Sequence, residues 1–185
     1  MIRPAALAAL LFAIAPAAMA DQTNTFPPGS PSPAQTPSAP SGLIDASDPA
    51  AIVDLLEEAG FDARLTTQPT GAVQIESSIA ETNFWLYFQA CTPEFTGCEV
   101  ITFSSGFDFD SPQVRDILGD WNATHYTKAY LDDSGDPFVE FSVNMVHGVS
   151  RENFINTLNW FTTEVKAFMD QIGWNNDTGG TAQPI

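Results

Sequence analysis

The chain has 185 residues, a length that suits one globular domain rather than two. Six Lys and Arg against 23 Asp and Glu give a formal net charge of −17. A polyanion of this size repels DNA, RNA and anionic lipid surfaces, so we expect no nucleic-acid partner. Two Cys and two His also argue against a four-ligand zinc site.

The first 20 residues have the pattern of a secretory signal peptide. Arg3 precedes an entirely apolar run over residues 5–15, and Ala18-Met19-Ala20 supplies small residues where signal peptidase cleaves. The apolar run is shorter than the roughly 20 residues that span a bilayer. We therefore expect cleavage after Ala20, no membrane insertion and a periplasmic or secreted product. Loss of Arg3 leaves five basic against 23 acidic residues, a net charge of −18.

Residues 21–46 contain six Pro, several Ser and Thr and a single aromatic, Phe26. Such a segment cannot bury enough apolar surface to offset its ordering entropy, so we expect a disordered tether. Recognition of a partner domain by this Pro-rich segment is the alternative. Residues 173–185 are expected to form a flexible tail, which leaves residues 47–172 as the folded domain.

Three helices are predicted in this domain, each from a capping residue followed by apolar residues three and four positions apart. The first two begin at Asp48 and Ser111, each followed by Pro, and the third begins near Ser150. Their apolar stripes are Ile52, Leu55, Leu56 and Ala59; Val114, Ile117, Leu118 and Trp121; and Phe154, Leu158, Phe161, Val165, Phe168 and Ile172. The third stripe is expected to cover a sheet. A dimer seam is the alternative, but Trp160 and Met169 make the apolar face wider than such a seam.

Between the helices the apolar pattern changes to a period of two, which predicts strands. We expect strands near residues 61–67, 73–76, 84–89, 99–104, 125–131 and 139–145. Neighbouring strands joined by tight turns, such as the turn at residues 132–137, indicate an antiparallel sheet. The sequence therefore predicts an α+β domain of about six strands and three helices in the order α-β-β-β-β-α-β-β-α.

Cys91 and Cys98 bracket the loop between two predicted strands. In an oxidising compartment two Cys at this spacing are expected to form a disulfide, worth about 2–3 kcal/mol by loop closure. A redox-active pair is the alternative. Such pairs usually have a Cys-x-x-Cys spacing at a helix N-terminus, and here Glu94 and Glu99 lie close in sequence, where they would raise a thiol pKa.

No catalytic residue is predicted. His125 and His147 are the two imidazoles, and the chain contains no Gly-x-Ser-x-Gly, His-Glu-x-x-His or glycine-rich phosphate motif. An envelope hydrolase that combines either His with Asp108 or Asp120 and a serine is the alternative.

Two acidic clusters raise the further alternative of a calcium-dependent binding module. Asp108 and Asp110 are close neighbours, and Asp132, Asp133 and Asp136 crowd the predicted hairpin turn. The turn lacks EF-hand spacing, and Asp, Ser and Gly are typical of hairpin turns in general. We therefore expect neither a metal nor a cofactor.

Four stretches of the folded domain together resemble the YbjN-like family of bacterial proteins, whose domain is similar to type III secretion chaperones. They are Ile52–Phe61; Phe84–Phe88 with Cys91 and Gly97-Cys98; Trp121-Asn122 with Tyr130–Asp132 and Gly135–Glu140; and Gly148–Ser150 with the long helix that carries Trp160 and Phe168. The resemblance covers residues 47–172 and includes no catalytic motif. At His147 relatives often have a second Gly.

The resemblance implies a secretion-chaperone-like α+β domain, often paired as a homodimer, with no enzymatic residues to carry over. Relatives are described as sensory-transduction regulators. Trp85 and Tyr87 would be surplus to a sheet with one buried face, so they either pack under a helix or contact a partner. We therefore expect a non-enzymatic, exported protein-binding or chaperone-like module, with Trp85 and Tyr87 as its candidate surface for a protein client.

Overall fold

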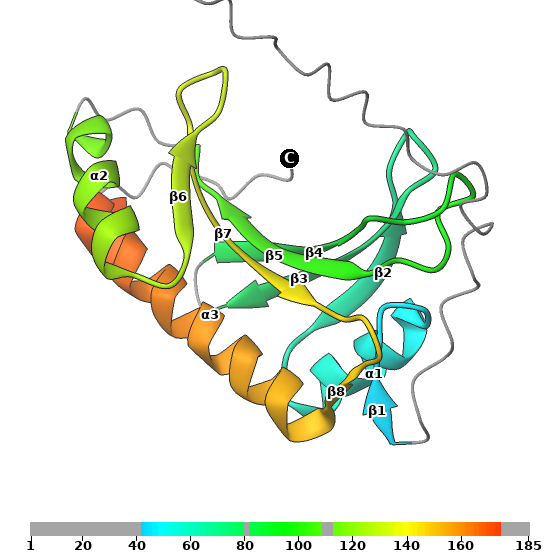
Figure 1. Cartoon of the computed structure of the whole chain (residues 1–185). Helices are drawn as coiled ribbons and strands as arrows, with labels where there is room; N and C mark the ends of the chain where they lie inside the picture. The colour runs from blue at the N-terminus through cyan, green and yellow to red at the C-terminus, as the bar shows by residue number, and fades with distance from the viewer. Residues whose placement is uncertain (1–41, 80–81, 109–112, 175–185) are drawn as a thin grey trace, which may run out of the picture. The chain divides into compact units, whose positions relative to one another are not determined.

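A computed structural model of the chain describes residues 42–79, 82–108 and 113–174 (Figure 1). The helices within these ranges are α1 (Pro49–Glu58), α2 (Val114–Thr124) and α3 (Arg151–Ile172). The strands are β1 (Leu43–Ile44), β2 (Ala63–Thr67), β3 (Val73–Ile79), β4 (Thr82–Gln89), β5 (Val100–Gly106), β6 (Lys128–Leu131), β7 (Pro137–Asn144) and β8 (Val149–Ser150). Apart from the two-residue strands β1 and β8, this is the predicted order of elements.

Six strands form one sheet in the order β2-β3-β4-β5-β7-β6, and every neighbouring pair is antiparallel. The predicted α+β class and six-stranded antiparallel sheet are therefore confirmed. β5 pairs with β7 rather than with β6. After α2, the chain thus enters the sheet at its edge as β6 and turns back into β7 beside β5.

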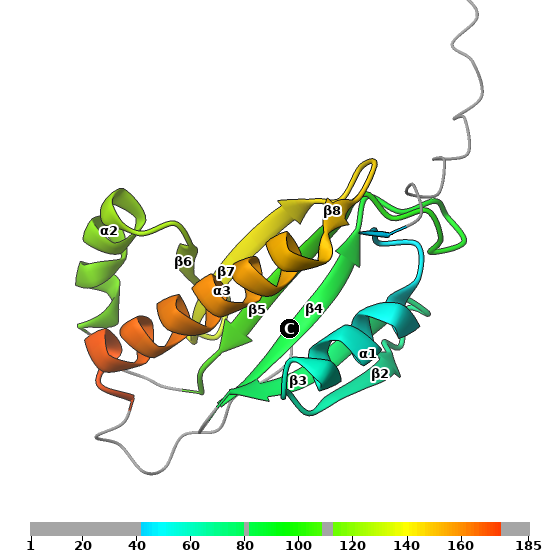
Figure 2. The same cartoon turned by 90° about the horizontal axis from the view of Figure 1, so that it is seen from below.

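Helices α1 and α3 lie on the same face of this sheet, which Figure 2 shows from below. Side chains of a strand alternate between its two faces, so Phe84, Leu86 and Phe88 of β4 all point toward the helices and join the apolar core. α2 contacts the edge strand β6 and also α3. The covering role predicted for the third helix is confirmed.

The predicted caps of α1 and α3 are present. Asp48 Oδ1 accepts the N–H of Ala51 at 3.1 Å, with Pro49 as the first helical residue. Ser150 Oγ accepts the N–H of Asn153 at 3.1 Å, and α3 ends at Gly173, whose φ of 80° lies in the left-handed region that glycine adopts freely.

A layer of aromatic rings fills the space between α3 and the sheet. Phe103 of β5 lies 5.7 Å from Phe154 and 5.5 Å from Phe161, measured between ring centroids. All six residues of the predicted α3 stripe are buried. Burial of a side chain of this size stabilises the fold by about 1.5–3 kcal/mol before entropy costs, so this layer is the main attachment of α3.

The folded part extends beyond both boundaries expected from the sequence. β1 and Ala46 both precede residue 47, yet β1 pairs with β8 and Ala46 is 2% exposed. At the other end Trp174 is 5% exposed and its ring centroid lies 5.1 Å from that of Phe107. The predicted signal peptide, most of the tether, the cap at Ser111 and the tail from residue 175 lie outside the described residues.

Two sequence-based expectations for α3 have different outcomes. Met169 is buried at 4% exposure, as predicted, whereas Trp160 is 52% exposed, so the prediction that it widens the buried face is wrong. None of the described helices is both long and apolar enough to cross a membrane.

Candidate functional site

The two most exposed aromatic side chains of the described residues lie next to each other. Tyr126, just after α2, is 77% exposed, and Trp160 on α3 is 52% exposed. Their rings stack with centroids 5.6 Å apart and an interplanar angle of 22°. They line a pocket of about 160 Å³, here called the aromatic pocket, together with Thr127, Phe141, Phe161, Thr163 and Glu164.

Helix geometry explains why Trp160 faces solvent. Residues three and four positions apart share a helix face, so Trp160, Thr163 and Glu164 lie along one side of the pocket. Phe161 is rotated from Trp160 by about 100° around the helix axis, and this rotation carries it into the core. Trp160 therefore lies at the rim of the apolar stripe.

The segment that follows α2 supplies two further residues of the pocket, Tyr126 and Thr127. His125 N–H donates to the Trp121 carbonyl at 2.9 Å, and His125 then takes an extended conformation with φ −111° and ψ 161°. In an extended segment alternate side chains point the same way, so His125 and Thr127 both reach Glu164. Tyr126, between them, is left at the surface.

A hydroxyl, an imidazole and a carboxylate meet beside the aromatic pocket, which Thr127 and Glu164 line. The Thr127 hydroxyl donates to Glu164 Oε2 at 3.1 Å, and His125 Nδ1 lies 3.1 Å from the same oxygen. Because an ionised carboxylate only accepts hydrogen bonds, the proton of a neutral imidazole here lies on Nδ1. Trp121 Nε1–H donates to Thr127 Oγ1 at 3.1 Å, and the Trp121 ring stacks on the imidazole with centroids 3.5 Å apart.

The order of these groups differs from that of a nucleophile triad. In a triad the hydroxyl donates to the imidazole and the imidazole donates to the carboxylate. Here Thr127 and His125 both contact Glu164, and Thr127 is 3% exposed. The carboxylate beside His125 comes from α3 rather than from Asp108 or Asp120. The network joins α2, the segment just before β6 and α3, and two of its residues, Thr127 and Glu164, line the pocket.

The second imidazole lies apart from this network. His147 is exposed in the turn between β7 and β8, next to Gly148, and its φ of 65° is in the left-handed region. The turn is closed by the N–H of Gly148, which donates to the carbonyl of Met145 at 2.9 Å. The position at which the family resemblance predicts a Gly thus has the backbone conformation that glycine favours.

Trp85 and Tyr87 do not form an exposed surface in this structure. Both project from β4 toward the sheet face opposite α1 and α3, and they are 2% and 5% exposed. Trp85 occupies a central row of the sheet, where its cross-strand neighbours are Glu76 and Ser104. Among the described residues the exposed aromatics are therefore elsewhere, and contact of Trp85 or Tyr87 with a partner stays a prediction.

The same sheet face carries a hydrogen-bonded polar group near the β6 edge. Glu140 Oε1 accepts from the Tyr130 hydroxyl at 2.9 Å and from Ser104 Oγ at 3.3 Å. Burial, and then the hydrogen bond to Glu140, raise the pKa of Tyr130 well above its ordinary value of 10.0. Tyr130 therefore acts as a hydrogen-bond donor and not as a base.

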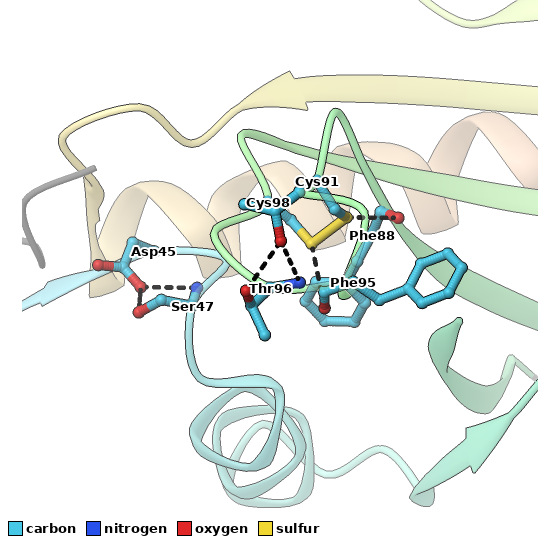
Figure 3. Close-up of a disulfide and its surroundings, with 8 residues drawn as sticks. Asp45, Ser47, Phe88, Cys91, Phe95, Thr96 and Cys98 are labelled. Atoms are coloured by element: carbon cyan, nitrogen blue, oxygen red, sulfur yellow. Dashed lines mark hydrogen bonds between the residues drawn. A yellow bond between two sulfur atoms is a disulfide. The ribbon is translucent and has the colours of Figure 1, made fainter. Parts of the chain in front are cut away.

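The predicted disulfide between Cys91 and Cys98 is present, with an S–S distance of 2.14 Å (Figure 3). It closes the loop between β4 and β5. Inside the loop Phe95 N–H donates to the Thr92 carbonyl at 2.9 Å, and Thr92 N–H donates to the Thr96 carbonyl at 2.8 Å. These bonds make the loop a compact turn at one end of the sheet.

The acidic hairpin is organised by one of its own carboxylates. Asp132 Oδ1 accepts the backbone N–H groups of Ser134 and Asp136 at 2.8 and 2.9 Å, which is how Asp stabilises a turn. Within the described ranges, no group of three or more His, Cys, Asp or Glu side chains is placed to hold a metal ion. Asp110, of the other acidic cluster, lies outside these ranges.

Neither exposed aromatic residue of the pocket, Tyr126 or Trp160, was predicted from the sequence to form a functional site. The available signal was the phase of the α3 stripe: at about 100° per residue, Trp160 lies about 120° around the helix from the centre of the stripe, whereas the buried Met169 lies about 60° from it. Nothing in the sequence indicates that Tyr126 meets Trp160, since their contact depends on how α2 and α3 pack.

The fold and this pocket define a class: an α+β domain whose six-stranded antiparallel sheet carries two helices on one face, with an aromatic pocket beside the α2–α3 contact. A family profile described as "YbjN: Putative bacterial sensory transduction regulator" matches residues 48–174. The chain therefore belongs to the YbjN family.

Two solved structures are similar to this chain. One is an uncharacterized protein from Methanothermobacter thermautotrophicus, with 14% identity, coverage of 68% of this chain and 96% of that chain, and a TM-score of 0.48. The other is YbjN of E. coli, titled "a putative transcription regulator", with 15% identity, coverage of 68% and 90%, and a TM-score of 0.47. No curated protein sequence matches.

Proposed function

We propose that this chain is an exported, non-enzymatic regulatory module that binds a protein partner through its aromatic pocket. The observation that carries this proposal is the exposed stack of Tyr126 on Trp160 at the pocket. Trp and Tyr dominate the binding energy of many protein interfaces, because their large rings bury much apolar area at a low entropy cost. Solvent-exposed rings beside a pocket are a surface of this kind.

The network beside the pocket supports a binding role over catalysis. The His-based triad needs a hydroxyl that transfers its proton to the imidazole, and the Thr127 hydroxyl instead donates to Glu164 and accepts from Trp121. Thr127 is also nearly inaccessible, at 3% exposure. The His-based hydrolase that the sequence left open would need a different arrangement of these groups.

The family supports the regulatory part of the proposal. A regulator of sensory transduction acts by binding other molecules, and a domain with a preformed surface pocket fits that description. A chaperone-like role, in which the pocket holds an incompletely folded client, uses the same surface and the same test.

Export is supported by two features of the chain. The first 20 residues have the pattern of a signal peptide, and disulfides such as Cys91–Cys98 persist in oxidising compartments such as the bacterial periplasm. We propose a periplasmic or secreted location. Fractionation of cells after expression of the full chain, with mass measurement of the mature N-terminus, tests it.

Site-specific photo-crosslinking in the intact envelope tests the partner surface. A benzophenone amino acid in place of Tyr126 is expected to give a discrete protein adduct, and Trp160→Ala in the same chain should abolish that adduct. Leu65, which is 48% exposed on β2, is the matched control position and should give no such product.

Two results would contradict this function. The same adducts from positions 126 and 65 would mean that no specific surface exists at the pocket. Turnover of an ester, peptide or glycan by the purified chain, lost on His125→Ala, would make the protein an enzyme.

A further inference from the structure

We infer that the aromatic pocket takes the guanidinium group of an arginine on the partner protein. This inference rests on the proposed function, since it names the chemistry that the pocket would recognise. Its first support is the lining: the exposed aromatic residues Tyr126 and Trp160 and the half-buried Phe141, with Glu164 as the charged residue and no Lys or Arg among the lining residues. Aromatic faces attract cations through their quadrupole, so this lining favours a positive group.

The electrostatics of the pocket point the same way. Glu164 has a side chain that is 17% exposed, so its carboxylate is partly shielded from water and acts more strongly on a nearby charge. The pocket also adjoins the C-terminal end of α2, where the helix dipole is negative and where the last turn has no basic residue. The overall charge of −17 adds a long-range attraction for basic partners.

The size of the pocket suits one planar group. A pocket of about 160 Å³ has room for a small side-chain group such as a guanidinium with its neighbouring methylene, which has five non-hydrogen atoms. Trp160 is 52% exposed and lines the same pocket as Glu164, so a planar cation in the pocket can contact the indole while it donates to the carboxylate.

Arginine fits better than the other cations a partner could offer. A lysine ammonium is strongly hydrated and donates from a point, whereas guanidinium is weakly hydrated, planar and donates in a fork that matches a carboxylate. A second copy of this chain is disfavoured as the occupant, because two chains of charge −17 repel each other.

Titration of the purified chain with matched peptides tests the inference. The probe is a short Gly/Ser peptide with one central arginine, and its control has citrulline, a neutral group of the same shape. Binding is followed by the indole N–H signal of Trp160 in NMR spectra and by calorimetry, at a pH of about 8, where an ordinary imidazole is neutral. The arginine peptide is expected to bind about tenfold more tightly than the citrulline peptide, and a lysine peptide to fall between them.

Single-residue variants distinguish binding in the pocket from unspecific attraction of the peptide to the acidic chain. Trp160→Ala should abolish binding of the arginine peptide, and Glu164→Gln, which keeps an acceptor for Thr127, should weaken it about tenfold. Asp133→Asn removes the same charge from the exposed hairpin turn and should leave binding unchanged.

The inference is overturned if arginine and citrulline peptides bind equally, or if Asp133→Asn weakens binding as much as Glu164→Gln. Trp160-dependent binding of choline without binding of the arginine peptide would also overturn it, because the pocket would then select quaternary ammonium groups. If the envelope adduct at position 126 depends on Trp160 while the arginine peptide fails, the proposed function stands and this inference alone falls. If the peptide binds and no adduct forms, the proposed function falls instead.

Discussion

At the scale of single residues, three non-glycine residues in the described part of the chain have a positive backbone φ. They are Ala90 at 52°, Phe95 at 57° and His147 at 65°. An L-residue in this region costs about 1–2 kcal/mol, because its Cβ crowds the following carbonyl. His147 is the most informative of the three, since the family resemblance predicts a glycine there and its side chain is exposed.

We expect His147→Gly to raise the free energy of unfolding by about 0.5–1 kcal/mol. The variant removes the backbone strain of the left-handed conformation, about 1–2 kcal/mol. Glycine also gives the unfolded chain more conformational entropy, and this offsets part of the gain in stability. His147→Val, which is β-branched and resists this conformation, should lower stability by a comparable amount. Urea unfolding of the three proteins measures the difference, and a glycine variant less stable than the parent would mean that the imidazole makes a contact worth more than the strain.

At the scale of elements, α2 protects an edge of the sheet. β6 is an edge strand, and such a strand exposes backbone groups that can pair with other chains. The Asn122 side chain occupies the groups of one residue: its Nδ2 donates to the Ala129 carbonyl at 2.9 Å, and its Oδ1 accepts the Ala129 N–H at 2.7 Å. An amide side chain thus stands in for a neighbouring strand at this position.

Asn122→Ala is expected to lower the free energy of unfolding by about 1–3 kcal/mol, because it leaves both backbone groups of the buried Ala129 without their partner. Asn156→Ala, at an exposed position of α3, is the matched control and should stay within about 0.5 kcal/mol. Thermal and urea unfolding measure both variants. Equal changes in the free energy of unfolding for the two variants would show that water can replace the Asn122 side chain without loss of stability.

At the scale of the whole molecule, both faces of the sheet contain buried side chains. The face under α1 and α3 holds the apolar core, and the opposite face holds Trp85 and Tyr87 at 2% and 5% exposure. The exposed aromatic surface is instead at the contact between α2 and α3. In the function proposed here, stability and recognition therefore depend on different aromatic residues.

A pair of tryptophan variants tests this division. Trp85→Ala is expected to lower the free energy of unfolding by about 3–5 kcal/mol, the usual cost of deleting a buried aromatic side chain. Trp160→Ala, at 52% exposure, should change it by less than about 1 kcal/mol. Chemical unfolding followed by far-UV circular dichroism compares them. A Trp85 variant as stable as the parent would instead support the prediction that Trp85 contacts a partner.

Much of the fold could be predicted from local patterns. Capping residues such as Asp48 and Ser150, the three- and four-residue steps of Phe154–Ile172 and the alternation in β4 are all short-range features of the backbone. The spacing of Cys91 and Cys98 identified their disulfide for the same reason, since both ends of the loop are close in sequence.

The sequence by itself determined the three helices, the six strands of the main sheet, their order along the chain, the acidic charge and the family, because each depends on composition or on spacing within a few residues. Only the tertiary structure decided which aromatics face solvent and which acid meets His125. Tyr126 and Trp160, like His125 and Glu164, are brought together by the packing of α2 against α3. Long-range contacts of this kind depend on how whole elements pack, and no local pattern records that packing.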